Sequence, residues 1–582
     1  MTLDKVVMTK GGNCDYGVAI IGGGPAGSTA GTLLKRYNPD LQVVILEREI
    51  FPRDHIGESL LPPISPILQE MGCWDKIEAA DFPVKLGATY RWGKSPELWD
   101  FDFFPVVQFK DEPRPAKYAG QRLATAFQVD RSIYDKILLN HAEECGCVVR
   151  QGTKVAKVHK VGDRVTALEL ADGEAVVARH YIDASGNSGI LRRAMNVECD
   201  YHPALKNIAI WDYWQNAEWA VKIGVGGTRI QVRTVPFGWI WFIPMGPTRT
   251  SVGLVVPADY YAKSGMRPAE LYLHALKQEP TLASLLENAT CEDNLKTTKD
   301  WSFLASRHAG ENWFLIGECA GFADPILSAG VTMAHIAGQQ VAYTINEIEH
   351  GGDDNWLKEQ FELRQSQRIN THIRFGDYWY TANAQLKDLK EFTSGLARSS
   401  GLELTPDKAW DWISRGGFID EELRIGIGGF GLASIKESHY YLTDIAFDSI
   451  LEKCNVFRLN LSGASTKERA SYINGRVGKT KCYQRDGKVL PIRGVFELLV
   501  GILEHESKLR NIVDVINYCA QQNTNNPDFM RNVLPQITQG LEAMVRDGWV
   551  EGSYDPAEPL AKVSSGFVGF HPNTDATAGG RT

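Results

Sequence analysis

Residues 17–48 read GVAIIGGGPAGSTAGTLLKRYNPDLQVVILER. A short apolar run over 17–24 ends in glycines, and a helical pattern follows from Pro25 to about Arg36. A second apolar run, LQVVILER, occupies 41–48. A strand, a helix and a second strand in this order predict the βαβ unit of an α/β, Rossmann-like fold.

The glycines between the first strand and the helix predict a dinucleotide site. Gly22, Gly24 and Gly27 fit the pattern G-x-G-x-x-G. In this pattern the first glycine permits the tight turn, the second lets the backbone approach the pyrophosphate, and the third lets the helix pack on the strand. The first turn of the helix, which contains Ala26, supplies N–H groups and a positive dipole end. Glu47 follows Gly27 by 20 positions, where an acid binds the adenosine ribose.

Composition narrows the class of protein. The chain has 582 residues, a formal net charge of −9 and 43% hydrophobic residues, which predicts a globular protein of two or three packing units with no nucleic-acid partner. It contains no apolar run of about 18 residues, and its N-terminus has no apolar signal segment, so we expect a cytoplasmic protein without a membrane partner. Ten scattered cysteines without C-x-x-C pairs suggest reduced thiols, and we predict no metal site.

Hydrophobic patterning predicts four regions. Residues 1–350 form a cofactor-binding core, with an interleaved β-sheet substrate domain from about 86–125 and 200–300. A mainly helical extension over 351–480 shapes the substrate site. A small helical module with one terminal strand follows over 481–562, and the Ser-, Gly- and Thr-rich end, 563–582, is a flexible tail.

A second group of motifs identifies the dinucleotide. Residues 313–334, WFLIGECAGFADPILSAGVTMA, resemble the second FAD fingerprint of the hydroxylase-like flavoproteins, although Glu318 stands where that pattern has aspartate. DASG at 183–186 and VDRSIYDKILLNHA at 129–142 resemble two further signatures of that superfamily. The resemblance implies FAD as cofactor, with flavin-site residues Arg48, Arg53, Ser59, Arg131, Glu318, Asp324, Gly330 and Val331 in addition to the residues of the first βαβ unit. For Arg131, a surface salt bridge is the alternative.

Three segments suggest the chemistry. Residues 239–244, WIWFIP, match the W-x-W-x-I-P motif of the flavin-dependent halogenases, and 51–62 and 82–93 resemble other segments of the phenol- and pyrrole-type branch of that family. By themselves, Trp239 and Trp241 would be neighbours on one face of a core strand, and Lys85 would be a surface charge. The three segments together resemble this family over about residues 17–350.

The resemblance implies a mechanism. Reduced FAD and oxygen oxidise a halide held by N–H groups at Ala329 and Gly330, and the hypohalous acid reaches Lys85. Lys85 either donates a hydrogen bond to the acid or forms a haloamine, and the second route needs burial to lower its pKa. Trp239 and Trp241 keep the substrate away from the flavin, and Glu58 is the remaining candidate catalytic residue.

The partners follow from the same resemblance. Leu327 occupies the position at which tryptophan-specific halogenases carry a glutamate, so we expect an electron-rich phenol, pyrrole or enolisable substrate, free or bound to a carrier protein. No separate nicotinamide-binding unit is visible, so a separate reductase should supply reduced flavin. The alternatives are an aromatic monooxygenase or double-bond reductase on the same scaffold, and a noncatalytic flavoprotein.

Overall fold

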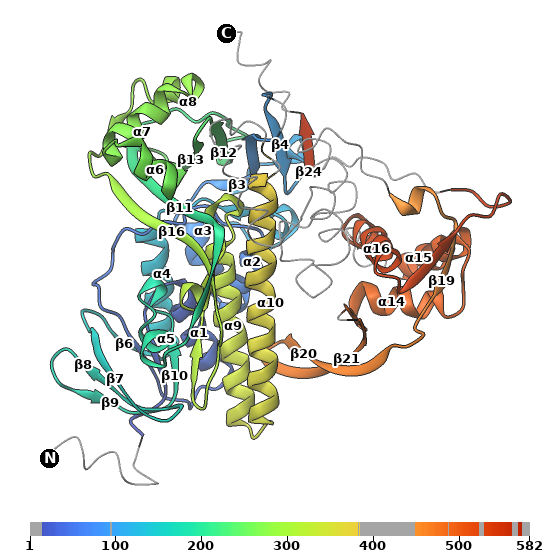
Figure 1. The fold of residues 1–582 in the computed structure, drawn as a ribbon, viewed down its shortest axis with the longest axis horizontal. Helices are drawn as coiled ribbons and strands as arrows, with labels where there is room; N and C mark the ends of the chain where they lie inside the picture. Colours follow the sequence, from blue (N-terminus) through green and yellow to red (C-terminus); the bar gives the residue numbers. More distant parts are fainter. Residues whose placement is uncertain are drawn as a thin grey trace.

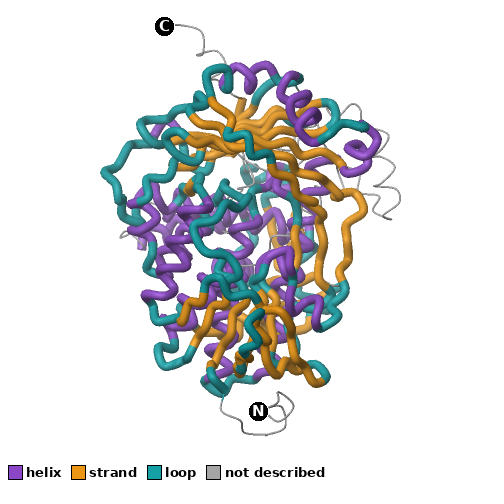
Figure 2. The backbone as a smooth tube through the Cα atoms, turned by 90° about the vertical axis from the view of Figure 1, so that its left-hand side faces the viewer, coloured by secondary structure: helices purple, strands orange, loops and turns teal. Residues whose placement is uncertain are grey.

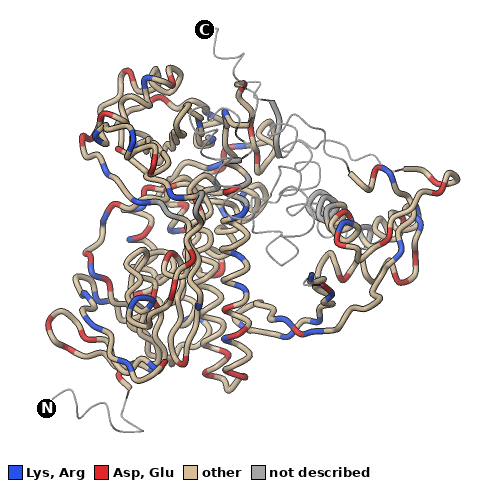
Figure 3. Tube along the Cα trace, viewed as in Figure 1, with Lys and Arg blue, Asp and Glu red and all other residues tan. Residues whose placement is uncertain are grey.

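The structure is a computed structural model that describes residues 14–93, 96–381, 383, 449–486, 488–522, 529–560 and 569–572. A mixed α/β core occupies the chain up to residue 383, and a C-terminal module lies beside it (Figure 1). Strands gather at opposite ends of the core, with helices between them (Figure 2). Lys and Arg are interspersed with Asp and Glu along the trace (Figure 3).

The predicted βαβ opening is confirmed. β1 (Tyr16–Ile21), α1 (Pro25–Tyr37) and β2 (Val43–Leu46) follow one another, and the strands pair in parallel. β6 (Val148–Arg150), β10 (Ala178–Asp183) and β17 (Trp313–Leu315) complete a five-stranded sheet in the order β17-β10-β1-β2-β6. Fully buried Val18, Ala19 and Ile20 explain why β1 lies in the middle of it.

Helices cover this sheet. α1 packs against α4 (Arg131–Glu144) and α9 (Gly330–Glu349), while α2 (Ile64–Met71), α3 (Trp74–Ala79) and α5 (Ile190–Ala194) fill the flanks. α10 (Asp354–Thr381) runs back along α9 toward the second sheet (Figure 1). Beside these helices, β7 (Val155–Val161) and β8 (Arg164–Leu170) form an antiparallel hairpin, and β9 (Ala175–Val176) pairs with β8.

The second sheet has eleven strands. Its order is β18-β16-β11-β14-β13-β12-β3-β4-β24, with β15 and β5 paired beside this path. Its strands are β3 (Val84–Arg91), β4 (Trp99–Asp102), β5 (Ala126–Phe127), β11 (Cys199–Gln215), β12 (Gly227–Val235), β13 (Gly238–Pro244), β14 (Arg249–Pro257), β15 (Thr290–Cys291), β16 (Lys296–Ala305), β18 (Gly321–Phe322) and β24 (Gly569–Pro572). α6 (Ala258–Ser264), α7 (Pro268–Lys277) and α8 (Pro280–Leu285) pack on one face, and the other face looks into the core.

The region after α10 differs from the helical expectation. α10 is a helix, but β19 (Val456–Leu459), β20 (Ser465–Ile473), β21 (Arg476–Arg485) and β22 (Lys488–Pro491) are strands, and the expected boundary at 480 falls inside β21. The turn Asn474-Gly475 joins β20 to β21 with φ of 48° and 80°. Asn-Gly with two positive φ values is a strong signal for a β-hairpin. The sequence prediction missed this turn because it relied on helical periodicity in this region. Residues 384–448 lie outside the described residues.

The predicted C-terminal helices are present. α14 (Gly494–Leu503), α15 (Leu509–Gln522) and α16 (Phe529–Arg546) are followed by the expected terminal strand, β23 (Val550–Ser553). The expected flexible tail, 563–582, contains β24, which pairs with β4 of the core. None of the helices in the described ranges has the length and apolarity needed to cross a bilayer.

Candidate active site

The carboxyl edge of the parallel sheet brings together the FAD motifs predicted from sequence. The loop Gly22–Gly24 follows β1, Glu47 follows β2, the loop 184–186 follows β10, and 317–319 follows β17. The strands lie side by side in the order β17-β10-β1-β2, so four segments that are distant in sequence form one cradle. Ligands of open α/β sheets bind outside this edge.

The three glycines of the first motif are required for different reasons. Gly22 has φ 105°, and a Cβ there would lie 2.4 Å from the Ala184 carbonyl oxygen. A Cβ on Gly27 would lie 2.0 Å from the Gly22 carbonyl oxygen. At Gly24, by contrast, the nearest atom to a Cβ is Arg53 Nη2, at 3.6 Å. The protein itself requires Gly22 and Gly27 but leaves open space at Gly24, which fits the approach of a pyrophosphate.

Glu47 is fixed at the end of β2. Its carboxylate accepts hydrogen bonds from the backbone N–H of Gly23 at 2.7 Å and of Glu49 at 2.9 Å. The neighbouring Arg48 side chain is exposed and donates to Ser188 Oγ at 3.3 Å. Glu47 therefore lies within the cradle beside the first glycine loop, and Arg48 lies at its rim.

Arg131 is a buried residue and not the surface ion pair that was its alternative. Its guanidinium donates to both carboxylate oxygens of Asp135, at 2.7 and 2.9 Å, and to the Ile56 carbonyl at 2.7 Å. Arg53 lies 3.3 Å from the same carboxylate. Burial opposes the charge of Asp135, but the Arg131 guanidinium lowers its pKa below the usual value. Sequence reasoning missed Asp135, although its i,i+4 spacing from Arg131 was a signal.

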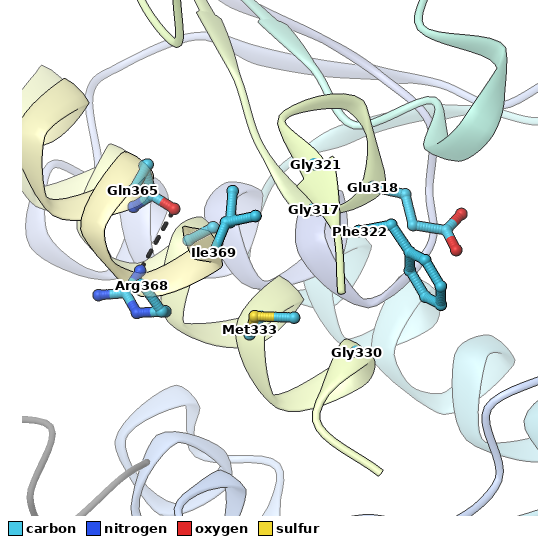
Figure 4. A pocket seen from close by; sticks show the side chains of 10 residues that line it. Gly317, Glu318, Gly321, Phe322, Gly330, Met333, Gln365, Arg368 and Ile369 are labelled. Carbon is cyan, nitrogen blue, oxygen red and sulfur yellow. Dashed lines mark hydrogen bonds between the residues drawn. The ribbon is translucent and has the colours of Figure 1, made fainter. Parts of the chain in front are cut away.

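The second FAD fingerprint lies beside α9 and α10. Burial raises the pKa of Glu318, whose carboxylate is 3.5 Å from where a Gly186 Cβ would be. A cavity of about 20 Å³ separates this loop from α10, with Gly330 and Met333 of α9 on its wall. In Figure 4, Glu318 and Phe322 lie on one side of it, and Arg368, which donates to Gln365 at 3.2 Å, lies on the other.

The loop that precedes α9 (residues 324–330) presents a helix N-terminus. Because the sequence predicts that this loop holds the halide, it is here called the halide loop. Ser328 has a left-handed φ of 55°, Ala329 is the buried N-cap residue, and Gly330 begins α9. The first N–H groups of an α-helix have no partner within the helix, so an anion fits here. Val331 lies next to Gly57, because a Cβ on Gly57 would be 3.3 Å from its Cγ2. Ser59 is buried and forms a β-bridge with Gln128 nearby.

An aromatic cluster covers the inner face of the second sheet. The rings of Trp239 and Trp241 are 6.0 Å apart, and Trp92 lies 6.2 Å from Trp239. Tyr90 stacks on Trp99 at 4.7 Å. Gly253 faces Trp241 on β14, where a Cβ would lie only 2.1 Å from the indole ring. We call this cluster, with Trp379 of α10 packed against it, the aromatic chamber.

A β-bulge directs Lys85 toward this chamber. Lys85 pairs with Thr228 and Gly87 with Arg229, so two residues of β3 oppose one step of β12. This extra residue shifts the alternation of side chains between the two faces of the sheet. Lys85 therefore lies on the inner face, which also carries Ala88 and Tyr90. Its amine lies 5.3 Å from the centre of the Phe103 ring, which belongs to the same cluster as Trp239.

The Lys85 amine has no hydrogen bond or ion pair to any residue in the described part of the chain, and its side chain is 1% exposed. Burial without a counter-charge lowers its pKa to about 7. The sequence alone had left two roles open for this lysine. A buried amine that loses its proton near neutral pH meets the condition that the haloamine route requires.

Glu58 lies between the flavin cradle and the second sheet. Its carboxylate accepts from Tyr213 Oη at 3.2 Å and from the Gly57 N–H at 3.0 Å. Burial raises its pKa, although the nearby charge of Arg131 acts in the opposite direction. Tyr213 of β11 was not singled out from sequence, because a tyrosine within a strand pattern carries no local sign of such a contact.

Asp324 faces the aromatic chamber. It accepts hydrogen bonds from the Ile326 N–H at 2.9 Å, Asn207 Nδ2 at 3.1 Å and Tyr380 Oη at 3.2 Å. Burial raises its pKa to about 7. The sequence predicted a flavin contact for this residue. Asn207, Tyr380 and Trp379 were missed, since only the tertiary structure brings α10 and β11 to this loop.

Comparisons with known proteins agree on one family. A family model described as tryptophan halogenase matches residues 17–114 and 107–389. Tryptophan 2-halogenase of Chondromyces crocatus is 33% identical over 60% of this chain and 64% of its own length. The 1H-pyrrole-2-carbonyl-[peptidyl-carrier protein] chlorinase of Pseudomonas fluorescens is 33% identical over 55% of this chain and 73% of its own length. The chain thus spans less than two thirds of the first of these relatives.

Solved structures extend the similarity to the C-terminal region. The myxobacterial chondrochloren halogenase CndH, described as a new variant of FAD-dependent halogenases, has a TM-score of 0.57 and 29% identity over 68% of this chain and 92% of its own. CmlS, a flavin-dependent halogenase, has a TM-score of 0.68 and 26% identity over 95% of this chain and 99% of its own. The CmlS match therefore also includes the module that follows α10.

Proposed function

Because the chain belongs to the tryptophan halogenase family, we propose that it is an FAD-dependent enzyme that transfers chlorine or bromine to an electron-rich substrate. The cradle at the carboxyl edge of the parallel sheet supports FAD binding. We assign the pyrophosphate to Gly22–Gly27 and the α1 N-terminus, the ribose to Glu47, and the rest of the flavin site to Arg48, Arg53, Ser59, Arg131, Glu318 and Val331. Reduced FAD, when bound, supplies with oxygen the oxidising power that converts halide to hypohalous acid.

We assign halide binding to the backbone N–H groups at Ala329 and Gly330. The buried N-cap and the left-handed Ser328 hold this turn open at the start of α9. An anion there would lie at a positive dipole end. Glu58, hydrogen-bonded to Tyr213, is the proposed proton donor or acceptor on the flavin side. Trp239 and Trp241 separate that side from the substrate.

The observation that carries the halogenase assignment is the burial of Lys85, whose amine lies 5.3 Å from the Phe103 ring on the inner face of the second sheet. This burial lowers the pKa of the amine to about 7. In its neutral form the amine attacks the halogen of hypohalous acid, giving an N–halogen bond and releasing water. An aromatic C–H then exchanges its proton for the halogen, and the neutral amine is restored. Both steps conserve electrons, because the halide was oxidised before it reached Lys85.

For the substrate, we propose a phenol, a pyrrole or an enolisable carbon. Leu327 stands where a tryptophan-specific site would carry a glutamate, so the substrate must be activated by its own electron density. A carrier-bound substrate is the form that the pyrrole chlorinase from Pseudomonas fluorescens uses according to its name. A separate flavin reductase would supply the reduced cofactor.

The test is Lys85→Ala, assayed with FAD, a flavin reductase, NADH, bromide and a panel of phenols, pyrroles and indoles. Removing a covalent relay costs orders of magnitude in rate, so product measured by mass should fall at least about 100-fold. FAD occupancy and oxygen consumption should remain within about twofold of wild type, because Lys85 lies in the second sheet and not in the cradle.

Lys157→Ala is the matched control, since Lys157 is exposed on the β7 hairpin. It should leave both oxygen consumption and product unchanged. A wild-type enzyme that inserts oxygen and no halogen would instead establish a monooxygenase. Normal halogenation by Lys85→Ala would exclude Lys85 as the relay.

A further inference from the structure

Three elements meet at the hydroxyl of Tyr380, in the last turn of α10. The hydroxyl donates to Asp324 Oδ1 at 3.2 Å. It accepts from Trp239 Nε1 at 2.7 Å and from Asn207 Nδ2 at 3.3 Å. A phenolic oxygen has one proton and two lone pairs, so these three contacts match its hydrogen-bonding capacity. One atom thus joins α10 to β13, β11 and the halide loop.

The Asp324 contact reaches the halide loop directly. The carboxylate oxygen that receives the Tyr380 proton also accepts the Ile326 N–H at 2.9 Å, and so caps the turn Pro325–Leu327. Ser328 follows at once in the left-handed region, with φ 55°, a conformation that persists only when its surroundings impose it. Asp324 therefore shapes the turn that ends at Ala329 and Gly330.

The Trp239 contact reaches the aromatic chamber. The indole is buried against Trp92 and Trp241, and the only hydrogen bond recorded for its N–H within the described residues is the one to Tyr380. The Tyr380 ring itself packs edge-on against Trp92, with centroids 5.6 Å apart. Contacts with the neighbouring rings hold the indole ring of Trp239 in place, and the hydrogen bond to Tyr380 fixes the direction of its N–H group.

We propose that Tyr380 is a positioning residue that couples Trp239 of the aromatic chamber to the halide loop through Asp324. This inference rests on the proposed function, because it assigns a halide to that loop. Tyr380→Phe keeps the ring and its packing but removes the shared oxygen. It leaves Trp239 Nε1 without its acceptor and removes one of the three donors to Asp324, and buried polar groups that lose a partner relax toward new ones.

The first experiment measures halide dependence with the FAD-loaded full-length enzyme. In Tyr380→Phe, the KM for bromide should rise about tenfold, the size expected when a buried polar group loses a hydrogen-bond partner, while kcat changes less. FAD occupancy should stay at the wild-type level. A general loss of folding would instead lower FAD occupancy and kcat together.

Tyr272→Phe provides a matched control on the opposite face of the same sheet. Tyr272 is also buried, accepts an indole N–H from Trp214 at 3.0 Å and donates to the Val252 carbonyl at 3.2 Å. Among the described residues, its hydrogen-bond partners are Trp214 and Val252 and lie outside the halide loop, so the bromide KM should not change. If Tyr380→Phe and Tyr272→Phe alter the bromide KM equally, the coupling is refuted.

A second measurement does not need turnover. In ¹⁵N-indole spectra of the FAD-loaded protein, the Trp239 signal is identified by its loss in Trp239→Phe. Adding bromide should shift this signal in wild type and leave it unmoved in Tyr380→Phe. If the protein never halogenates but shows this difference between wild type and Tyr380→Phe, the proposed function is wrong and the coupling is supported. No bromide shift in wild type, or the same shift in both proteins, would sink the coupling.

Discussion

Lys85 shows how burial sets the chemistry of a single side chain. Its amine faces the Phe103 ring and has a pKa of about 7, so the neutral form is half populated near that pH. The folded-state pKa is lowered, and the neutral, nucleophilic form therefore increases as the pH rises through about 7. The fraction of consumed oxygen that appears as halogenated product should increase from pH 6 to pH 8.5.

The contrary result would be equally informative. If Lys85 instead acts as an ammonium that donates a hydrogen bond to the hypohalous acid, deprotonation would remove the active form over the same pH range. The product fraction would then fall as the pH rises. Lys85→Arg separates the routes at one pH, because a guanidinium stays charged and cannot supply the neutral amine. We expect it to be inactive in halogenation with normal oxygen consumption.

Gly24 allows a test of the cofactor site at the same scale. The protein has room for a side chain there, since only Arg53 Nη2 approaches, at 3.6 Å. Gly24→Asp should therefore fold normally but place a carboxylate at the position that we assign to the pyrophosphate. The purified protein should lack flavin absorbance near 450 nm and keep its far-ultraviolet circular dichroism. Full FAD occupancy in this variant would disprove the phosphate assignment.

At the scale of elements, the turn between β20 and β21 anchors the C-terminal strands on the core. Gly475 has φ 80°, and a Cβ on it would lie 2.3 Å from the Tyr37 ring of α1. Gly475→Ala should therefore lower the free energy of unfolding by roughly 1–3 kcal/mol, as strained positions of this kind do. Urea unfolding measures the loss.

Gly478→Ala is the control, in the strand β21 that follows this turn. Gly478 is exposed, and a Cβ there would meet only the Ser471 carbonyl oxygen, at 4.0 Å. Its unfolding should match wild type within about 0.5 kcal/mol. Equal stability of Gly475→Ala and Gly478→Ala would mean that the hairpin does not depend on its contact with α1.

At the scale of the whole molecule, the described residues contain one parallel sheet with one dinucleotide fingerprint. We therefore expect the flavin to need electrons from another protein. The FAD-loaded enzyme mixed with NADH or NADPH alone should keep its oxidised spectrum for many minutes, and should bleach within seconds when a flavin reductase is added. Rapid bleaching without the reductase would indicate an enzyme that binds nicotinamide itself.

The local sequence determined the cofactor fold. Strand, glycine turn, helix and acid are contiguous or closely spaced, so residues 17–48 predict β1, α1, β2 and Glu47 without any tertiary information. The same holds for the tryptophans of β13, whose alternation places both on one face. The Asn474-Gly475 hairpin was equally local and was overlooked because the surrounding region was interpreted as helical.

The way in which these parts contact one another depends on long-range packing. The β3 bulge arises from pairing with β12, more than 140 residues away, and it shifts the side-chain alternation of β3 next to Lys85. Burial by distant strands, and not the local sequence, lowers the pKa of that amine. The Tyr380 hydroxyl meets Trp239 and Asp324 because α10 ends against the second sheet. Residue identity fixes what each group can do, but its charge state and its partners depend on contacts that no local pattern encodes.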